Sequence, residues 1–164
     1  MRTKIFISAL LLIVIAFSVT GCDRMMPVEY FEFGIVLDVS FESYDSDGAF
    51  DVAYANGDVI MGMTRYSFVD CEEYGLLSTL SPDKLAEVYC DKSGKGEECE
   101  IKKEGDVPYY FYSTADGFTY LMSFYRTPYA YFVVTYITPT AKFDEAYDDI
   151  LDYMSSAYIL QEHI

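Results

Sequence analysis

The chain has 164 residues, of which 52% are hydrophobic, and its 27 acidic side chains outnumber its 11 Lys and Arg. This length excludes two large domains. The net charge of −16 argues against a nucleic-acid partner, because binding to that polyanion depends on Lys and Arg that neutralise phosphates. The 17 Tyr and 12 Phe exclude a disordered acidic tail, so we expect a folded acidic domain.

The first 21 residues predict an export signal. Arg2 and Lys4 precede an apolar run of about fifteen residues, which is too short to span a membrane comfortably. The run ends in VTGC, which resembles the bacterial lipobox. The resemblance implies transfer of a diacylglycerol to the Cys22 thiol, cleavage after Gly21, and durable anchoring by two or three acyl chains. The alternative is an ordinary export signal whose Cys22 joins a disulfide.

The lipobox sets the expected boundaries, which are a signal peptide over 1–21, a lipidated tether over 22–29 and a single α+β domain over 30–164. Without the leader, nine basic side chains face 27 acidic ones, a net charge of −18. We expect the protein at the outer face of the plasma membrane. Repulsion from anionic head groups should make the domain stand off the bilayer.

The first half of the domain reads as strands followed by a short helix. Residues 29–43 predict one bent strand or two short ones. Residues 49–68 predict a hairpin whose Asn56-Gly57 pair suits a tight type I′ turn. The segment SPDKLAEVYC then predicts a short helix, with Ser81 as its N-cap and Pro82 in the first helical position.

The second half predicts four antiparallel strands and a long helix. Four β-rich runs between residues 98 and 139 are separated by turn residues, which is typical of a meander. From residue 138 or 140 to about 157 the apolar period becomes helical. One stripe of this helix should dock on the sheet; it comprises Phe143, Tyr147, Ile150, Leu151, Met154 and Tyr158.

This order of elements, with FDEAYDDILDYMSSAYI as the closing helix, resembles the PsbP-like family. The resemblance covers nearly all of residues 30–158. It implies an α/β/α sandwich, as in photosystem extrinsic proteins, a Ran-binding nuclear import factor and many small bacterial lipoproteins. Members of such families are mostly non-enzymatic binding or assembly subunits. A cystatin-like or other helix-on-sheet α+β fold is the alternative.

Three cysteines remain if Cys22 carries lipid, so at least one thiol has no partner within the chain. Cys90 ends the predicted helix and Cys99 opens the next strand, which favours a bridge between these two. Pairing of Cys71 with Cys90, or fully reduced thiols, are the alternatives. The chain has no CxxC motif and no His close to these cysteines in sequence, which argues against thiol redox catalysis and a zinc site.

Asp45, Asp47 and Asp51 surround Gly48 in a pattern that partly matches a calcium loop. A further oxygen ligand before the glycine and a Glu six residues after it are missing. We therefore expect a solvated turn that uses Asp and Gly for their turn preferences. Calcium is therefore an alternative, and we otherwise expect no cofactor beyond the lipid on Cys22.

The sequence offers few residues that could catalyse a reaction. The single histidine, His163, is one residue from the end of the sequence, which argues against Ser/His/Asp and Cys/His arrangements. A carboxylate pair acting as acid and base remains as an alternative, although the chain has no Trp for sugar stacking.

Aromatic residues are concentrated in the predicted meander. Strand alternation should place Tyr110, Tyr112, Tyr120 and Phe124 on one face of the sheet. Such ladders stabilise sheets through cross-strand pairs, but they can also form a recognition surface.

These features together predict a lipid-anchored extracytoplasmic module that binds or assembles with an envelope protein and does not catalyse a reaction. Because the domain is strongly acidic, the expected partner is basic or cationic. A receptor for a small solute or a divalent cation is one alternative, and a carboxylate-dyad enzyme is another.

Overall fold

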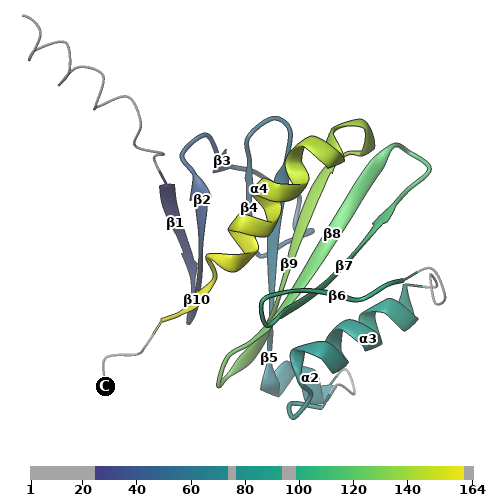
Figure 1. Ribbon diagram of the computed structural model, residues 1–164. Coiled ribbons are helices and arrows are strands. Elements are labelled where there is room, and N and C mark those ends of the chain that lie inside the picture. Colours follow the sequence, from purple (N-terminus) through teal and green to yellow (C-terminus); the bar gives the residue numbers. More distant parts are fainter. Residues whose placement is uncertain (1–24, 74–76, 94–98, 161–164) are drawn as a thin grey trace, which may run out of the picture.

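The computed structural model describes residues 25–73, 77–93 and 99–160. The expected signal peptide and Cys22 lie outside these residues. Two antiparallel sheets form the framework (Figure 1). Within the described ranges, no helix is both long enough and apolar enough to cross a bilayer.

The larger sheet has seven strands in the order β3-β4-β5-β9-β8-β7-β6, and every neighbouring pair is antiparallel. The meander predicted over residues 98–139 is confirmed, since its four strands follow one another across the sheet. The strands are β3 (Glu42–Ser43), β4 (Val52–Ala55), β5 (Ile60–Ser67), β6 (Lys102–Glu104), β7 (Val107–Ser113), β8 (Phe118–Arg126) and β9 (Ala130–Pro139).

The smaller sheet has the order β1-β2-β10 and was not expected as a separate unit. It contains β1 (Met25–Tyr30), β2 (Phe33–Asp38) and β10 (Tyr158–Ile159). The expected tether over residues 22–29 is wrong in its boundary, because Met25 already pairs with Asp38. The physical reason is alternation: Val28 is buried in the core while its neighbours on β1 are exposed, so this segment forms a half-buried strand.

Two groups of helices cover opposite faces of the larger sheet. The short α2 (Phe68–Glu73), which the sequence did not predict, and α3 (Pro82–Lys92) lie on one face. A 3₁₀ turn, η2 (Thr140–Lys142), leads into α4 (Phe143–Ser155), which packs on the other face beside the smaller sheet (Figure 1). The α+β fold class with a short middle helix and a C-terminal amphipathic helix is confirmed.

Each face of the larger sheet has its own core. The larger core joins α4 and the smaller sheet to the strands, and Phe33 of β2 stacks on Phe132 with ring centroids 4.8 Å apart. The smaller core joins α2 and α3 to the sheet, where Leu85 and Cys90 are buried. The chain thus forms three layers, with the larger sheet in the middle.

The start of α3 agrees with its predicted capping. The Ser81 hydroxyl accepts a hydrogen bond from the Lys84 amide at 3.3 Å, and Pro82 occupies the first turn. The hairpin between β4 and β5 is also confirmed, but its turn is not type I′. Among residues of that turn only Gly57 has a positive φ, of 91°, whereas type I′ requires positive φ at both central residues.

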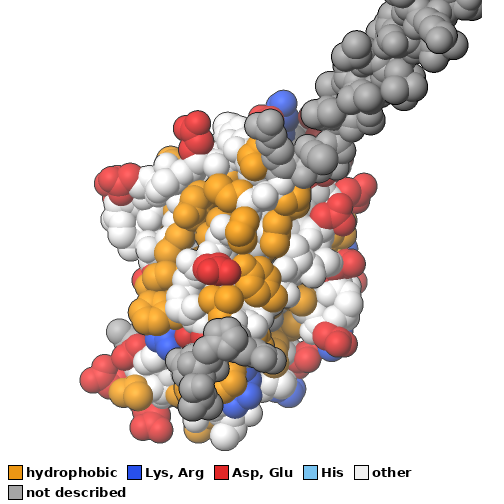
Figure 2. All heavy atoms as spheres, turned by 90° about the vertical axis from the view of Figure 1, so that its left-hand side faces the viewer, with side chains coloured by type: hydrophobic (Ala, Val, Ile, Leu, Met, Phe, Trp, Pro, Cys, Tyr) orange, Lys and Arg blue, Asp and Glu red, His pale blue; other side chains and the backbone are white. Residues whose placement is uncertain are grey.

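The end of α4 differs from the sequence expectation. The helix stops at Ser155, and Tyr158 leaves the predicted helical stripe to pair with Gly34 on β2. The Tyr158 ring occupies the space where a side chain on Gly34 would begin. Its hydroxyl donates to Glu29 Oε1 at 2.8 Å across the outer surface of the smaller sheet. Figure 2 views this side of the molecule, where hydrophobic side chains gather in the middle and most acidic ones lie around the rim.

Candidate functional site

The candidate calcium loop does not bring its three carboxylates together. Asp45 Oδ1 accepts from the Asp47 amide at 3.0 Å, which closes a local turn in which Asp47 has a φ of 50°. Asp51 instead accepts from the Arg65 amide at 2.7 Å on the neighbouring strand. Among the residues that the structure describes, no group of three acidic, His or Cys side chains could hold a metal. The geometry therefore favours the turn interpretation.

The four aromatic residues do share one face of the larger sheet, but only two of them reach its surface. Tyr110 stacks on Phe124 at 5.8 Å, and both are about 1% exposed beneath α3. Burial raises the pKa of Tyr110 to about 12. Tyr112 and Tyr120, stacked at 5.4 Å, are half-buried beyond the end of the helix cover. The expected recognition surface is therefore wrong for Tyr110 and Phe124, which belong to the core.

Cys90 and Cys99 are joined by a disulfide in the structure, with their Cα atoms 5.9 Å apart. Cys71 is free and buried. Burial raises the pKa of the Cys71 thiol, with Asp70 adding to the effect, so the thiol stays protonated at neutral pH. This environment does not suit a reactive cysteine.

We expect Cys99→Ser to lower the free energy of unfolding by roughly 2–3 kcal/mol, because a bridge closing a loop of about ten residues restricts the unfolded chain. Urea unfolding with and without reductant would measure this. Reductant should destabilise the natural protein and leave the Cys99→Ser variant unchanged, and equal stability of the two proteins under oxidising conditions would contradict the prediction.

Glu32 is the only buried carboxylate among the described residues, and sequence reasoning missed it. It lies in the turn between β1 and β2, where the Thr127 hydroxyl donates to Oε1 at 2.7 Å. Arg65 Nε lies 3.3 Å from Oε2, and its guanidinium stacks 4.5 Å from the centre of the exposed Phe31 ring. These contacts fix the smaller sheet to β5 and to the turn after β8.

The contacts of Glu32 also set its ionisation. Burial alone raises the pKa of this carboxyl, but hydrogen bonds from Thr127 and Arg65 and the charge of Arg65 outweigh burial, so the pKa is lowered from 4.5. The group therefore stays ionised and paired. A carboxylate acid for glycoside chemistry needs a raised pKa, so Glu32 does not serve as one.

A pH dependence follows from this lowered pKa. The stabilisation from ionised Glu32 is complete above the unfolded pKa of about 4.5 and is lost as the pH falls through the folded-state value. We expect the melting temperature of the natural protein to fall more steeply below pH 4.5 than that of Glu32→Gln. Thermal unfolding monitored by circular dichroism from pH 7 to pH 3 would test this, and parallel curves would contradict it.

A groove runs between α4 and the ends of β2 and the β4–β5 hairpin. Two adjoining hollows of about 230 and 440 Å³ share Asn56, Asp149 and Tyr153 as lining residues. We call their union the α4 groove. Its carboxylates come from three elements: Asp38, Asp58, Glu145, Asp149 and Asp152. The last three recur on one face of α4 because their spacing of four and three residues matches the helical period.

Tyr153 forms part of the floor of the α4 groove and is 8% exposed. Burial, followed by the charges of Asp149, Asp38 and Asp152, raises the pKa of Tyr153. Carboxylates from β2 and α4 thus act together on the Tyr153 hydroxyl. The apolar ring beneath them gives the groove a surface on which the alkyl part of a Lys or Arg side chain can pack.

One cation of the chain already lies in the α4 groove. Lys142 Nζ is 3.5 Å from Asp58 Oδ1 and 3.9 Å from Glu145 Oε2. All three side chains are about half exposed or more, so these ion pairs are weak. Within the described residues, no salt bridge involves Asp38, Asp149 or Asp152.

No protein-family model matches this chain, and no curated protein matches it in sequence. Solved structures resemble it more clearly. The solution structure of the cyanobacterial PsbP protein (CyanoP) from Synechocystis sp. PCC 6803 superimposes with a TM-score of 0.53 at 11% identity, over 85% of this chain and 95% of that protein. The fold of this chain is PsbP-like.

A crystal structure from Bacteroides thetaiotaomicron is also similar, with a TM-score of 0.52 and 12% identity. The match covers 80% of this chain but only 46% of that protein. At such low identities the similarity establishes the PsbP-like fold and leaves the function to be argued from the site.

Proposed function

We propose that this protein is a lipid-anchored, extracytoplasmic and non-catalytic binding module that holds a basic segment of an envelope protein in the α4 groove. The groove carries the proposal, because five carboxylates and one lysine line its two adjoining hollows. Complementary charge increases the association rate and the specificity of binding to a cationic segment. The ion pairs of Lys142 support this proposal, because in them an ammonium group already lies beside two carboxylates of the groove.

Anchoring at Cys22 would place the α4 groove close to the membrane. Strand β1 begins at Met25, which also lines the groove. Three residues of extended chain reach at most about 11 Å, so a lipid on Cys22 holds this end of the domain near the head groups. Because β1 takes up residues 25–29 of the expected tether, the expected repulsion from anionic head groups can lift the domain from the bilayer by only this short distance. The partner's basic segment should accordingly lie near the membrane.

Anchoring is tested by Cys22→Ser. We expect the natural protein in the membrane fraction of the bacterial host, and Cys22→Ser in the soluble extracytoplasmic fraction, because the variant cannot accept the acyl chains. Metabolic labelling with a radioactive fatty acid should mark only the natural protein. Membrane association of both proteins without label would refute anchoring through Cys22.

Binding in the α4 groove is tested with full-length protein and a ten-residue oligolysine probe. We expect Asp149→Asn/Asp152→Asn to weaken binding by about two- to thirtyfold, because two ion pairs worth 0.2–1 kcal/mol each are lost. The matched control, Asp91→Asn/Glu100→Gln, makes the same change in net charge away from the groove. Equal weakening by both variants would show that the probe responds to net charge alone and would contradict the site.

Partner capture distinguishes the assembly role from a receptor for small solutes. Native membranes should yield one crosslinked envelope protein with the natural chain, and salt should abolish its recovery. The groove variant should lose this partner and the control variant should keep it. Recovery of the same protein by the groove variant would reject the α4 groove as the contact.

A further inference from the structure

The smaller sheet has one face in the core and one face that looks outward. Helix α4 and the larger sheet cover its inner face, and its outer face points away from the rest of the described chain (Figure 1). Alternation along β1 buries Val28 and directs Met25 and Pro27 outward. On β2, Ile35 is buried and Val36 takes the outward position opposite Pro27. The outer face therefore carries apolar side chains that no other element of the described chain covers.

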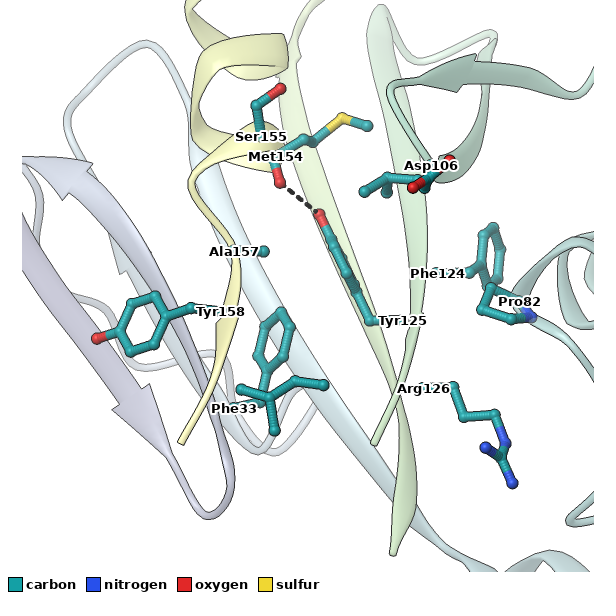
Figure 3. Close-up of a pocket in the computed structure, with 12 residues that line it drawn as sticks. Phe33, Pro82, Asp106, Phe124, Tyr125, Arg126, Met154, Ser155, Ala157 and Tyr158 are labelled. Carbon is teal, nitrogen blue, oxygen red and sulfur yellow. Dashed lines mark hydrogen bonds between the residues drawn. The ribbon is translucent and has the colours of Figure 1, made fainter. Parts of the chain in front are cut away.

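Tyr158 continues this outer face onto β10. Figure 3 shows its ring pointing away from Phe33 and Tyr125, which line an apolar cleft on the inner side of β10. The ring lies over Gly34 instead, and the hydroxyl donates to Glu29 Oε1 at 2.8 Å. A tyrosine with an apolar ring and a bonded hydroxyl is typical of the head-group layer of a membrane.

We call Met25, Pro27, Val36 and Tyr158 the outer patch. They lie on the side of the molecule that Figure 2 views, where hydrophobic side chains gather in the middle and most acidic ones lie around the rim. Met25 is 46% exposed, so the patch is open at the end where β1 begins.

Phe31 lies at the other end of the smaller sheet. It occupies the two-residue turn between β1 and β2 and is 64% exposed. Its φ of 51° falls in the left-handed region, which is unfavourable for a bulky side chain. The Arg65 guanidinium, 4.5 Å from the centre of the ring, holds the ring at the surface. An aromatic side chain kept exposed at a cost in backbone energy suits contact with an apolar or amphipathic partner.

The expected anchor joins the opposite end of β1. Cys22 precedes Met25 by three residues, a reach of at most about 11 Å. Strand β1 spans Met25–Tyr30, so Phe31 lies roughly 20 Å from Met25. A domain that stood on its Met25 end would hold Phe31 far from the head groups, whereas a domain lying on the outer patch brings both ends to the bilayer. The anchor makes even a weak patch sufficient, because it raises the effective concentration of the membrane surface.

We propose that the anchored protein lies on the bilayer with the outer patch and Phe31 in the head-group layer. This inference rests on the anchoring through Cys22 in the proposed function. Burial of apolar side chains at the boundary between head groups and acyl chains provides the attraction. The acidic rim is repelled by anionic head groups, so the contact should be strongest on zwitterionic lipids.

The test uses the lipidated protein reconstituted in phosphatidylcholine vesicles whose acyl chains carry bromine close to the head groups. The chain has no Trp, so Phe31→Trp introduces a single fluorescent reporter. Phe118→Trp is the matched control, because alternation places Phe118 with Phe124 on the α3 face of the larger sheet. We expect bromine to quench Phe31→Trp at least twice as strongly as Phe118→Trp. Added phosphatidylglycerol should weaken this quenching at low salt, and salt should restore it.

A second pair of variants, made in the Phe31→Trp protein, tests the outer patch itself. Pro27→Glu places a carboxylate in the patch and should reduce quenching at least twofold. Ala115→Glu makes the same change in charge at the exposed β7–β8 turn and should leave quenching unchanged. Matching melting temperatures would establish that both variants fold.

The mass of the purified protein separates the possible failures. Lipidated protein in which both reporters are quenched equally would reject the lying orientation and leave the anchoring intact. Protein without a lipid on Cys22 would reject the anchoring and this inference together. Quenching that Pro27→Glu does not change would reject the outer patch as the contact. An unquenched Phe31→Trp that becomes shielded from aqueous iodide as protein density rises would assign the patch to a second copy of this chain and would likewise reject the lipid surface.

Discussion

Replacing Arg65 with alanine is expected to lower the free energy of unfolding by roughly 3–5 kcal/mol, because it leaves the buried Glu32 carboxylate without its cation. The Glu32 side chain is only 7% exposed, so water cannot replace the guanidinium. The variant also loses the stacking of Arg65 on Phe31. Urea unfolding at pH 7 would measure the difference.

A double variant separates the loss of the ion pair from other effects of Arg65. Glu32→Gln removes the charge but keeps an amide oxygen that can accept from Thr127. Arg65→Ala should therefore cost much less in a Glu32→Gln background than in the natural protein. An equal cost in both backgrounds would show that packing of the Arg65 side chain, and not its charge, explains the result.

Replacing Phe33 with alanine should cost about 3–5 kcal/mol as well, because it opens a cavity between the two sheets. Phe33 is 1% exposed, and its ring centroid lies 4.8 Å from those of both Phe132 and Tyr125. These contacts hold β2 on the larger sheet. A loss of this size is a large part of the 5–15 kcal/mol that stabilises most domains.

Phe118 provides the matched control for Phe33, since it is 38% exposed at the start of β8. Phe118→Ala should destabilise the protein by less than half as much when both variants are unfolded in urea. Hydrogen exchange should in addition show faster opening of β1, β2 and β10 in Phe33→Ala than in Phe118→Ala. Equal costs would contradict the role of Phe33 in holding β2 on the larger sheet.

Local patterns in the sequence predicted most elements of the fold. Ser81 followed by Pro82 marks the start of α3, and Asn56-Gly57 marks the β4–β5 hairpin, because caps and turns depend on adjacent residues. The stripe of apolar residues at helical spacing predicted α4, because this period is also a short-range feature of the sequence. The sequence did not predict β10, since its two residues become a strand only where β2 offers an edge.

The candidate sites depended more strongly on distant contacts. Strand alternation correctly grouped Tyr110 with Tyr112 on one face, but only the docking of α3 decided that Tyr110 is buried. The α4 groove combines Asp38, Asp58 and Asp149 from three elements, and no local spacing reveals that meeting. Glu32 and Arg65 are 33 positions apart in the sequence, and no local pattern predicted that they pair.

The sequence by itself determined the acidic charge, the lipobox resemblance, the α+β class and the order of the main elements, because composition and short-range periodicity carry this information. Only the tertiary structure decided which carboxylates share a groove and which tyrosines are buried. These properties arise where elements distant in sequence pack together, and the chain specifies that packing through its whole core.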